Sequence, residues 1–510
     1  MASNHLFELI HSLSPTEKGY IKKMAFAPSK GDENSYIKLF DAIAAQEEYN
    51  EDKIIKKFRN EAFIKNISKS KNHLYNLILK RLTQYHEENL IEIKIKSILN
   101  QSVILYKKGL HEQALNNYER ALKLALENEE LQTANEIYSK MLDIYFIGKM
   151  GVKFPYQKEY LELAEKLRKQ EKIIDINIDL AEIMFADNFV KEEKSIQQIN
   201  LLVSHPSLKE IDENDSFLAR WGKLCALSQG YYLMGEFKKD EEVKLKQMEL
   251  LRADTTVNRN NPMRFVKHLV NLINVKINVS DYNAIPPLLK ELKNFKSAEN
   301  LCEHIEPLQR STYYIHSLTY FCQTNQFEKA EDILEEAILW FEANDKLISD
   351  YFKIIFYDMV FLVYFTQGEL KKCIPWLNNM VHLKSAFRIE FQLSIKFYQL
   401  ILHFELKNFE LIAYQIKSIY RELLKLNHNQ ETGKYILRWF QSNLKEIHNG
   451  KNLADAASEI KGRLKVMTTT GDWKLLTEMS VFKAWINSKI NKNSFRENYA
   501  ELFSMEVVEM

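Results

Sequence analysis

The chain has 510 residues, of which only 13 are Gly and 9 are Pro. Both residue types fall far below their average usage, so the composition predicts long helices with few interruptions. Apolar residues make up 46% and aromatic residues 12%, which excludes a globally disordered chain. The 70 basic and 69 acidic side chains leave a net charge of +1, so no overall field attracts nucleic acid or an anionic membrane.

The cysteines and the apolar segments indicate the cellular compartment in which the protein is expected. The chain has four cysteines and no CxxC pair: Cys225, Cys302, Cys322 and Cys373. This is no disulfide framework, which favours a reducing compartment. The first residues show no signal peptide, and the most apolar segment, 351–365, is too short for a bilayer and is interrupted by Lys353 and Asp358. We expect a cytoplasmic protein without membrane insertion.

Residues 1–95 are predicted to form a helical N-terminal module. The run Ser14-Pro15-Thr16-Glu17 is a capping box with proline at the first helical position, and it starts a helix that runs to about Ala25. A second helix is expected over 36–46, and two more near 51–66 and 69–87.

A basic stretch lies inside this module, with nine cations against one acid, Glu61. The cations are Lys53, Lys56, Lys57, Arg59, Lys65, Lys69, Lys71, Lys80 and Arg81. One interpretation is a surface that contacts phosphates or an acidic partner. The other is the solvated face of amphipathic helices, which we favour because neither interleaved aromatics nor a helix-turn-helix signature accompanies the charge.

A repeated layout begins after residue 95. A bulky residue opens the second helix of each unit: His111, Phe154, Phe189, Phe237, Tyr282, Phe327, Leu370 and Phe409, spaced by about 43 residues on average. The clearest unit spans 321–345, where one apolar stripe at helical spacing contains Ala330, Leu334, Ala337 and Phe341. Two-helix units in series predict an α-solenoid, because each hairpin must bury its apolar face against a neighbour.

The better-preserved units resemble the tetratricopeptide repeat. The residues that carry the resemblance are Gly109, Ala114, Tyr118 and Ala121 in one unit and Asn325, Phe327, Ala330, Leu334 and Ala337 in another. Gly235 to Phe237 and Gly368 to Leu370 match only the turn. Other units depart from the family, with Asp240, Ile285, Cys373 and Ile412 in the small-residue position, and the spacing exceeds the family's usual 34 residues.

This resemblance implies an all-α fold. It implies a right-handed α-solenoid of about eight helical hairpins over residues 96–430, and a role in binding peptides or proteins. Residues 431–510 lack the repeat but keep apolar residues at helical spacing over 473–490. We expect them to form a helical C-terminal cap, because a solenoid needs its terminal unit covered.

Catalytic and cofactor motifs are missing from the sequence. There is no GxxxxGK[ST], GxGxxG, HExxH or GxSxG, so no cofactor, metal site or enzyme activity is expected. The densest candidate is Cys302-Glu303-His304-Ile305-Glu306. Cys302 and Glu306 could share a helix face but His304 points elsewhere, so we interpret this run as a polar helix end.

If the first helix of each hairpin lines a concave wall, as in the family, its inward positions follow by counting back from each anchor. They are Gln229, Tyr232, Lys267, Asn274, Asn278, Thr312, Thr319, Gln323, Asp358 and Thr366. Their amides and hydroxyls suit hydrogen bonds to an extended backbone or a helix. Asp358 has apolar neighbours on both sides, so it must pair or face the groove.

The leading hypothesis is a non-enzymatic adaptor or scaffold that holds a protein or peptide in the solenoid groove. The alternative is a regulator whose basic N-terminal module binds nucleic acid while the solenoid senses a peptide or protein. The sequence leaves the partner and the oligomeric state open.

Overall fold

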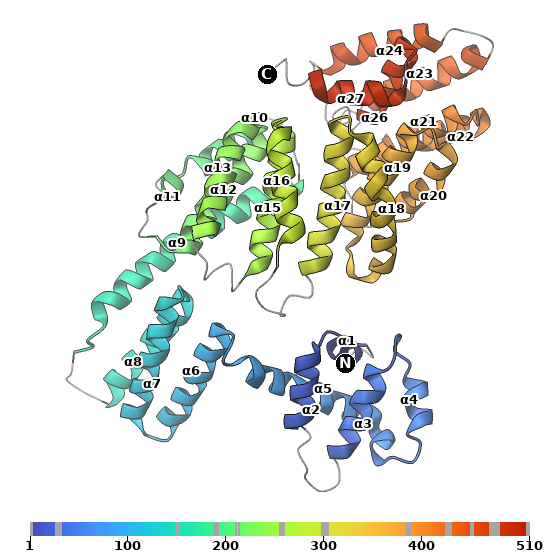
Figure 1. The fold of residues 1–510 in the computed structure, drawn as a ribbon. Coiled ribbons are helices and arrows are strands. Elements are labelled where there is room, and N and C mark those ends of the chain that lie inside the picture. The colour runs from blue at the N-terminus through green and yellow to red at the C-terminus, as the bar shows by residue number, and fades with distance from the viewer. Residues whose placement is uncertain are drawn as a thin grey trace. The chain divides into compact units, whose positions relative to one another are not determined.

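The computed structural model describes residues 4–25, 33–148, 153–186, 193–209, 212, 215–253, 261–296, 305–383, 389–423, 431–448, 453–468 and 480–505. Every regular element in these residues is a helix, and none of them forms a strand, which confirms the all-α prediction (Figure 1). Contacts divide the chain into two compact units. The first comprises 1–174, 211–220 and 299–303, and the second 175–210, 221–298 and 304–510.

The first unit contains α1 (His5–His11), α2 (Pro15–Ala25), α3 (Glu33–Ala44), α4 (Glu51–Lys57), the 3₁₀ turn η1 (Ala62–Asn66), α5 (Ile67–His86), α6 (Ile91–Lys107), α7 (His111–Glu127), α8 (Leu131–Gly148) and the start of α9 (Gln157–Ala186). The helices α1 to α5 enclose their own apolar core, which includes Ile10, Phe40, Leu74 and Ile78. A separate core joins α6, α7 and α8.

The second unit contains α10 (Glu193–Val203), α11 (Pro206–Lys209), most of α12 (Phe217–Met234), α13 (Phe237–Ala253), α15 (Pro262–Asn278), η2 (Tyr282–Ala284), α16 (Ile285–Asn294), α17 (Ile305–Gln323), α18 (Phe327–Ala343), η3 (Asp345–Leu347), α19 (Asp350–Thr366), α20 (Leu370–His382), α21 (Ile389–Glu405), α22 (Phe409–Leu423), α23 (Glu431–His448), α24 (Leu453–Thr468), α26 (Ser480–Asn491) and α27 (Phe495–Met505). From α15 onwards successive helices pack on each other, and α17 also packs on both α15 and α19.

The predicted capping box is confirmed at the start of α2. The backbone N–H of Glu17 donates to Ser14 Oγ at 3.3 Å, and the backbone N–H of Ser14 donates to Glu17 Oε2 at 2.8 Å. The helix expected near 51–66 is instead divided into α4 and η1, with a turn between them.

The hairpin turns share one backbone geometry. One or two residues after the first helix ends, the backbone has a positive φ, with values from 57° to 77°, at Gly109, Gly235, Ser280, Asn325, Gly368 and Lys407. In each turn the next backbone N–H donates to the carbonyl five residues earlier, at 2.8 to 3.0 Å. This is the Schellman motif, which satisfies carbonyls at a helix end. Glu129, between α7 and α8, has the same geometry.

The predicted anchors coincide with the element that follows this turn. His111, Phe237, Tyr282, Phe327, Leu370 and Phe409 are each the first residue of a helix or 3₁₀ turn. Phe189 lies outside the described residues. Phe154 precedes α9, where two helices were expected but one helix runs from Gln157 to Ala186. This stretch contains neither glycine nor proline, so nothing in it interrupts the helix.

The position predicted for a small residue is buried in every hairpin that shows the turn. Its occupants are 0% exposed whatever their size: Ala114, Asp240, Ile285, Ala330, Cys373 and Ile412. Asp240 is tolerated because Ser228 Oγ donates to Asp240 Oδ1 at 2.6 Å and Lys244 Nζ lies 2.9 Å from the same oxygen. A buried charge needs such partners.

One apolar core extends from α17 to α27. Phe341 and Phe356 stack at its centre, with ring centroids 3.7 Å apart. The helices α26 and α27 belong to the same core, because α26 packs on α21 and α27 packs on α17. The segment expected to be a terminal cap therefore contacts helices well before the end of the repeat region.

The close approach of α12 to α10 gives a testable prediction. A Cβ atom added at Gly230 would lie 2.2 Å from Val203 Cγ1, and the branched valine side chain cannot turn away freely. We expect Gly230→Ala to lower the free energy of unfolding by roughly 1–2 kcal/mol, measured by urea denaturation. Gly462→Ala is the control, because nothing lies within 4 Å of its added Cβ. Equal losses for both variants would contradict close packing at Gly230.

Candidate partner-binding site

The three threonines predicted to line the groove use their hydroxyls within their own helices. Thr312 Oγ1 donates to the Leu308 carbonyl at 2.6 Å, and Thr319 Oγ1 donates to the Ile315 carbonyl at 2.9 Å. Thr366 Oγ1 donates to the Val363 carbonyl at 2.7 Å. Thr312 is also 0% exposed, so it is not accessible to a partner.

Among the other predicted groove residues, several already have partners. The Asn274 amide lies 2.9 Å from His316 Nε2, and Gln229 Nε2 lies 3.8 Å from Met184 Sδ. The Tyr232 ring packs edge-on against Phe237 at 6.1 Å. Lys267 is exposed, and Asn278 is half-buried. The list does not define one continuous polar wall.

Gln323 on α17 and Asp358 on α19 lie in the parts of these helices that are nearest to α27. Asp358 is half-buried and makes no hydrogen bond or ion pair to any described residue, and burial raises the pKa of its carboxyl to about 7. Gln323 Oε1 is buried without a hydrogen-bond partner among the described residues. Burial, and then the charges of Cys322 and Asp358, raise the pKa of Tyr499 on α27 well above its ordinary value.

The helix α27 covers this surface with aromatic and charged contacts. Phe495 packs edge-on against Phe365 with centroids 4.8 Å apart. Arg496 lies 4.7 Å from the centre of the Phe327 ring and pairs with Glu328 at 2.5 Å. The helix α27 thus lies close to Asp358, one of the residues that the sequence assigned to a partner-binding groove.

The described cysteines are poorly suited to thiolate chemistry. Burial raises the pKa of Cys225 to about 11 and the pKa values of Cys322 and Cys373 to about 12. These thiols therefore stay protonated near neutral pH, and a thiol is a far weaker nucleophile than a thiolate. Within the described residues no three His, Cys, Asp or Glu side chains cluster as metal ligands. Cys302 and His304 lie outside those residues.

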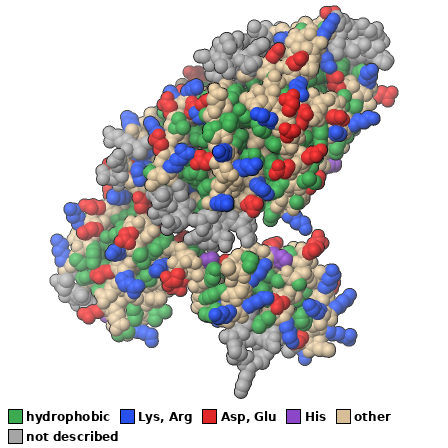
Figure 2. Space-filling view, in the orientation of Figure 1, with side chains coloured by type: hydrophobic (Ala, Val, Ile, Leu, Met, Phe, Trp, Pro, Cys, Tyr) green, Lys and Arg blue, Asp and Glu red, His purple; other side chains and the backbone are tan. Residues whose placement is uncertain are grey.

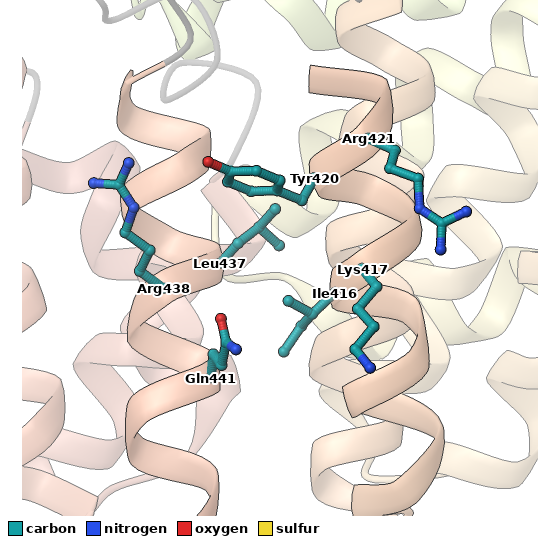
Figure 3. A pocket seen from close by; sticks show the side chains of 7 residues that line it. All are labelled: Ile416, Lys417, Tyr420, Arg421, Leu437, Arg438 and Gln441. Atoms are coloured by element: carbon teal, nitrogen blue, oxygen red, sulfur yellow. The ribbon is translucent and has the colours of Figure 1, made fainter. Parts of the chain in front are cut away.

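A pocket of about 400 Å³ lies between α22 and α23 (Figure 3). Ile416 and Leu437 are buried and form its floor, while Tyr420 reaches from α22 towards α23. Lys417, Arg421 and Arg438 complete the lining with Gln441. Figure 3 shows the three cations on the outer flanks of the two helices rather than converging on one point. We call this feature the α22–α23 groove.

The cations of the α22–α23 groove are exposed, and no described acidic side chain pairs with them. Tyr414, one turn before Lys417 on α22, is 72% exposed. Tyr414, Lys417 and Arg421 recur at i, i+3 and i+7, so they follow one face of α22. This groove was not predicted from the sequence. The signal for it in the sequence was the presence of these cations beside an apolar stripe.

The basic stretch of the N-terminal module separates into two groups. Lys71 is half-buried and pairs with Glu51, and Arg81 is half-buried with Nη1 donating to Gln84 at 2.8 Å. The other seven cations are exposed and form no ion pair with a described residue: Lys53, Lys56, Lys57, Arg59, Lys65, Lys69 and Lys80. Figure 2 shows Lys and Arg side chains gathered along the edge of the module where α4 lies.

The fold places the chain in the class of all-α proteins, built from helices that pack against their neighbours. No protein-family model, curated protein or solved structure matches the chain. Among the described helices, none combines the length and the apolar character needed to cross a bilayer.

Proposed function

We propose that this chain is a non-enzymatic scaffold that binds a protein or peptide partner on the surface of its helical hairpins. The α22–α23 groove carries the proposal, because it combines an apolar floor with cations that have no acidic partner among the described residues. Buried apolar anchors surrounded by polar groups are the usual anatomy of a peptide site. The proposed architecture is a right-handed α-solenoid of about eight tetratricopeptide-like hairpins in a cytoplasmic protein.

The helix α27 supports the same proposal from a different surface. It packs on α19 through Phe495, whose ring contacts Phe365, and on α18 through Arg496, which lies over Phe327 and pairs with Glu328. Aromatic residues and arginine are enriched at protein interfaces. The surface of the hairpins therefore has the chemistry needed to hold a helix.

A random peptide library displayed on phage and selected against the full chain tests the scaffold function. We expect enriched peptides that bind in solution with micromolar affinity or better and that cross-link to residues of the second unit. Selection in which no peptide is enriched over an unrelated helical control protein would contradict a peptide-binding function.

The second candidate function is contact with nucleic acid through the N-terminal module. The observation that favours it is the group of seven exposed cations without ion pairs among the described residues. Each phosphate neutralised on duplex DNA releases counterions, so log K falls by about 0.9 per contact for each unit of log salt.

If most of these cations contact phosphates, affinity for a fluorescent DNA duplex should fall by about 10³-fold or more between 50 and 200 mM salt. Replacing Lys53, Lys56 and Lys57 by glutamine should reduce the salt slope by about 3. The matched control replaces Lys140, Lys290 and Lys371, which are exposed and lie outside the basic stretch. No binding at low salt, or equal slopes for both triple variants, would remove this candidate.

A further inference from the structure

The chemistry of the α22–α23 groove restricts the kind of partner that can bind there. Its floor is apolar, since Ile416 and Leu437 are buried and Tyr420 is half-buried between the two helices. A ligand in the 400 Å³ pocket is favoured when it places apolar atoms against this floor, because polar groups placed there would lose hydrogen bonds to water.

The rim of the groove is cationic on both sides. Lys417 and Arg421 lie on α22 and Arg438 lies on α23, and none has an ion pair with a described residue. Of the lining residues none is acidic. Negative groups of a ligand are favoured at both flanks, and the like charges already on the rim repel a basic segment.

The directions of these three cations determine whether a compact or an elongated anion can contact them together. In Figure 3, Arg438 points outward from α23, while Lys417 and Arg421 point along and away from α22. The three charged groups therefore do not converge on one point that a compact anion such as phosphate could occupy. An elongated ligand with several negative groups and an apolar centre can contact both flanks and the floor.

Tyr414 extends the same surface along α22. It is 72% exposed and lies one turn before Lys417, so a chain that leaves the groove meets an aromatic ring next to the cations. Tyrosine supplies a large contact area at a low entropic cost when a partner binds.

We infer that the α22–α23 groove binds an acidic segment of a protein partner, with one large apolar side chain of that segment on the floor formed by Ile416, Leu437 and Tyr420. The carboxylates before and after that side chain pair with Lys417 and Arg421 on one flank and with Arg438 on the other. This inference rests on the proposed scaffold function and names the chemistry of its partner.

Three fluorescein-labelled peptides test the inference by polarisation with the full chain. The first has the sequence Glu-Glu-Asp-Leu-Phe-Glu-Asp-Glu, the second replaces its acids by Gln and Asn, and the third replaces Leu-Phe by Gly-Ser. We expect the first to bind most tightly, and each change to weaken binding by about tenfold or more. Equal binding of the acidic and neutral peptides would overturn the role assigned to the cations.

Reversing the charge of two groove cations tests whether the first peptide binds in the α22–α23 groove. The double variant Arg421→Glu with Arg438→Glu should weaken binding of the first peptide by at least about tenfold, since two attractive pairs become repulsive. The control Lys290→Glu with Lys371→Glu makes the same change in net charge at exposed positions outside the groove, and should change binding less than about twofold. Equal losses in both variants would show a general charge effect and overturn the assignment.

Two further outcomes separate this inference from the scaffold function. If library peptides bind the chain but the acidic peptide does not, the scaffold function stands and the inference is wrong. If inorganic phosphate at constant ionic strength displaces the acidic peptide and binds with comparable affinity, the groove is a site for small anions and the inference is again overturned. Circular dichroism melts of both double variants verify that they remain folded.

Discussion

Replacing Trp485 by alanine is expected to lower the free energy of unfolding of the second unit by about 3–5 kcal/mol. Trp485 is 1% exposed, and its ring lies 5.3 Å from the Phe404 ring and 5.9 Å from the Phe440 ring, between centroids. Its Nε1–H also donates to Glu405. Truncation would leave a cavity among these rings and remove one hydrogen bond from a carboxylate.

Urea denaturation followed by circular dichroism measures this loss, and hydrogen exchange shows where it acts. Amides of α26 and α27 should exchange faster in the variant, because Trp485 holds α26 against α21. Tyr414→Ala is the aromatic control. It removes a side chain that is 72% exposed and should change stability by less than about 0.5 kcal/mol. Similar stability of Trp485→Ala and the parent would contradict the docking of α26.

The variant Asp358→Asn is expected to remove a pH dependence of stability. Burial raises the pKa of the Asp358 carboxyl from 3.8 to about 7, so the folded chain holds this proton more tightly than the unfolded chain. The group therefore destabilises the fold progressively as pH rises from about 4 to about 7, and its effect is constant above that range. At 1.36 kcal/mol per pKa unit, and reduced because the side chain is only half-buried, the cost is about 2–3 kcal/mol.

Urea midpoints measured between pH 4 and pH 9 test this expectation. Asp358→Asn should match the parent at pH 4 and exceed its stability by about 2–3 kcal/mol at pH 8, since an amide of the same shape carries no charge to bury. Asp332→Asn is the control, because Asp332 is exposed on α18. Parallel pH profiles of Asp358→Asn and the parent would contradict an ionisable group in an apolar site.

The helices and their turns could be predicted from the sequence because local chemistry determines them. Phe237, Phe327 and Phe409 begin helices where they were expected, since each follows a turn whose geometry is set by the preceding few residues. The long helix α9 differs from the prediction because the repeat spacing implied a break between Phe154 and Phe189, whereas residues 157–186 contain no glycine or proline to interrupt a helix.

The candidate site could not be read from the sequence, because it depends on long-range packing. Arg496 on α27 pairs with Glu328 on α18 across 168 residues, and no local pattern in the sequence predicts this contact. The α22–α23 groove combines side chains from two helices of different hairpins. Counting back from an anchor also gives a helix face but not its exposure, which is why Thr312 was assigned to a groove although it is buried.

The residues with a positive φ in the hairpin turns show which substitutions these turns can accept. Gly, Ser, Asn and Lys all occur at that position, at Gly235, Ser280, Asn325 and Lys407, so the turn is specified by one backbone angle rather than by one side chain. A substitution among these four residue types should therefore keep the turn, because only the backbone angle has to be maintained.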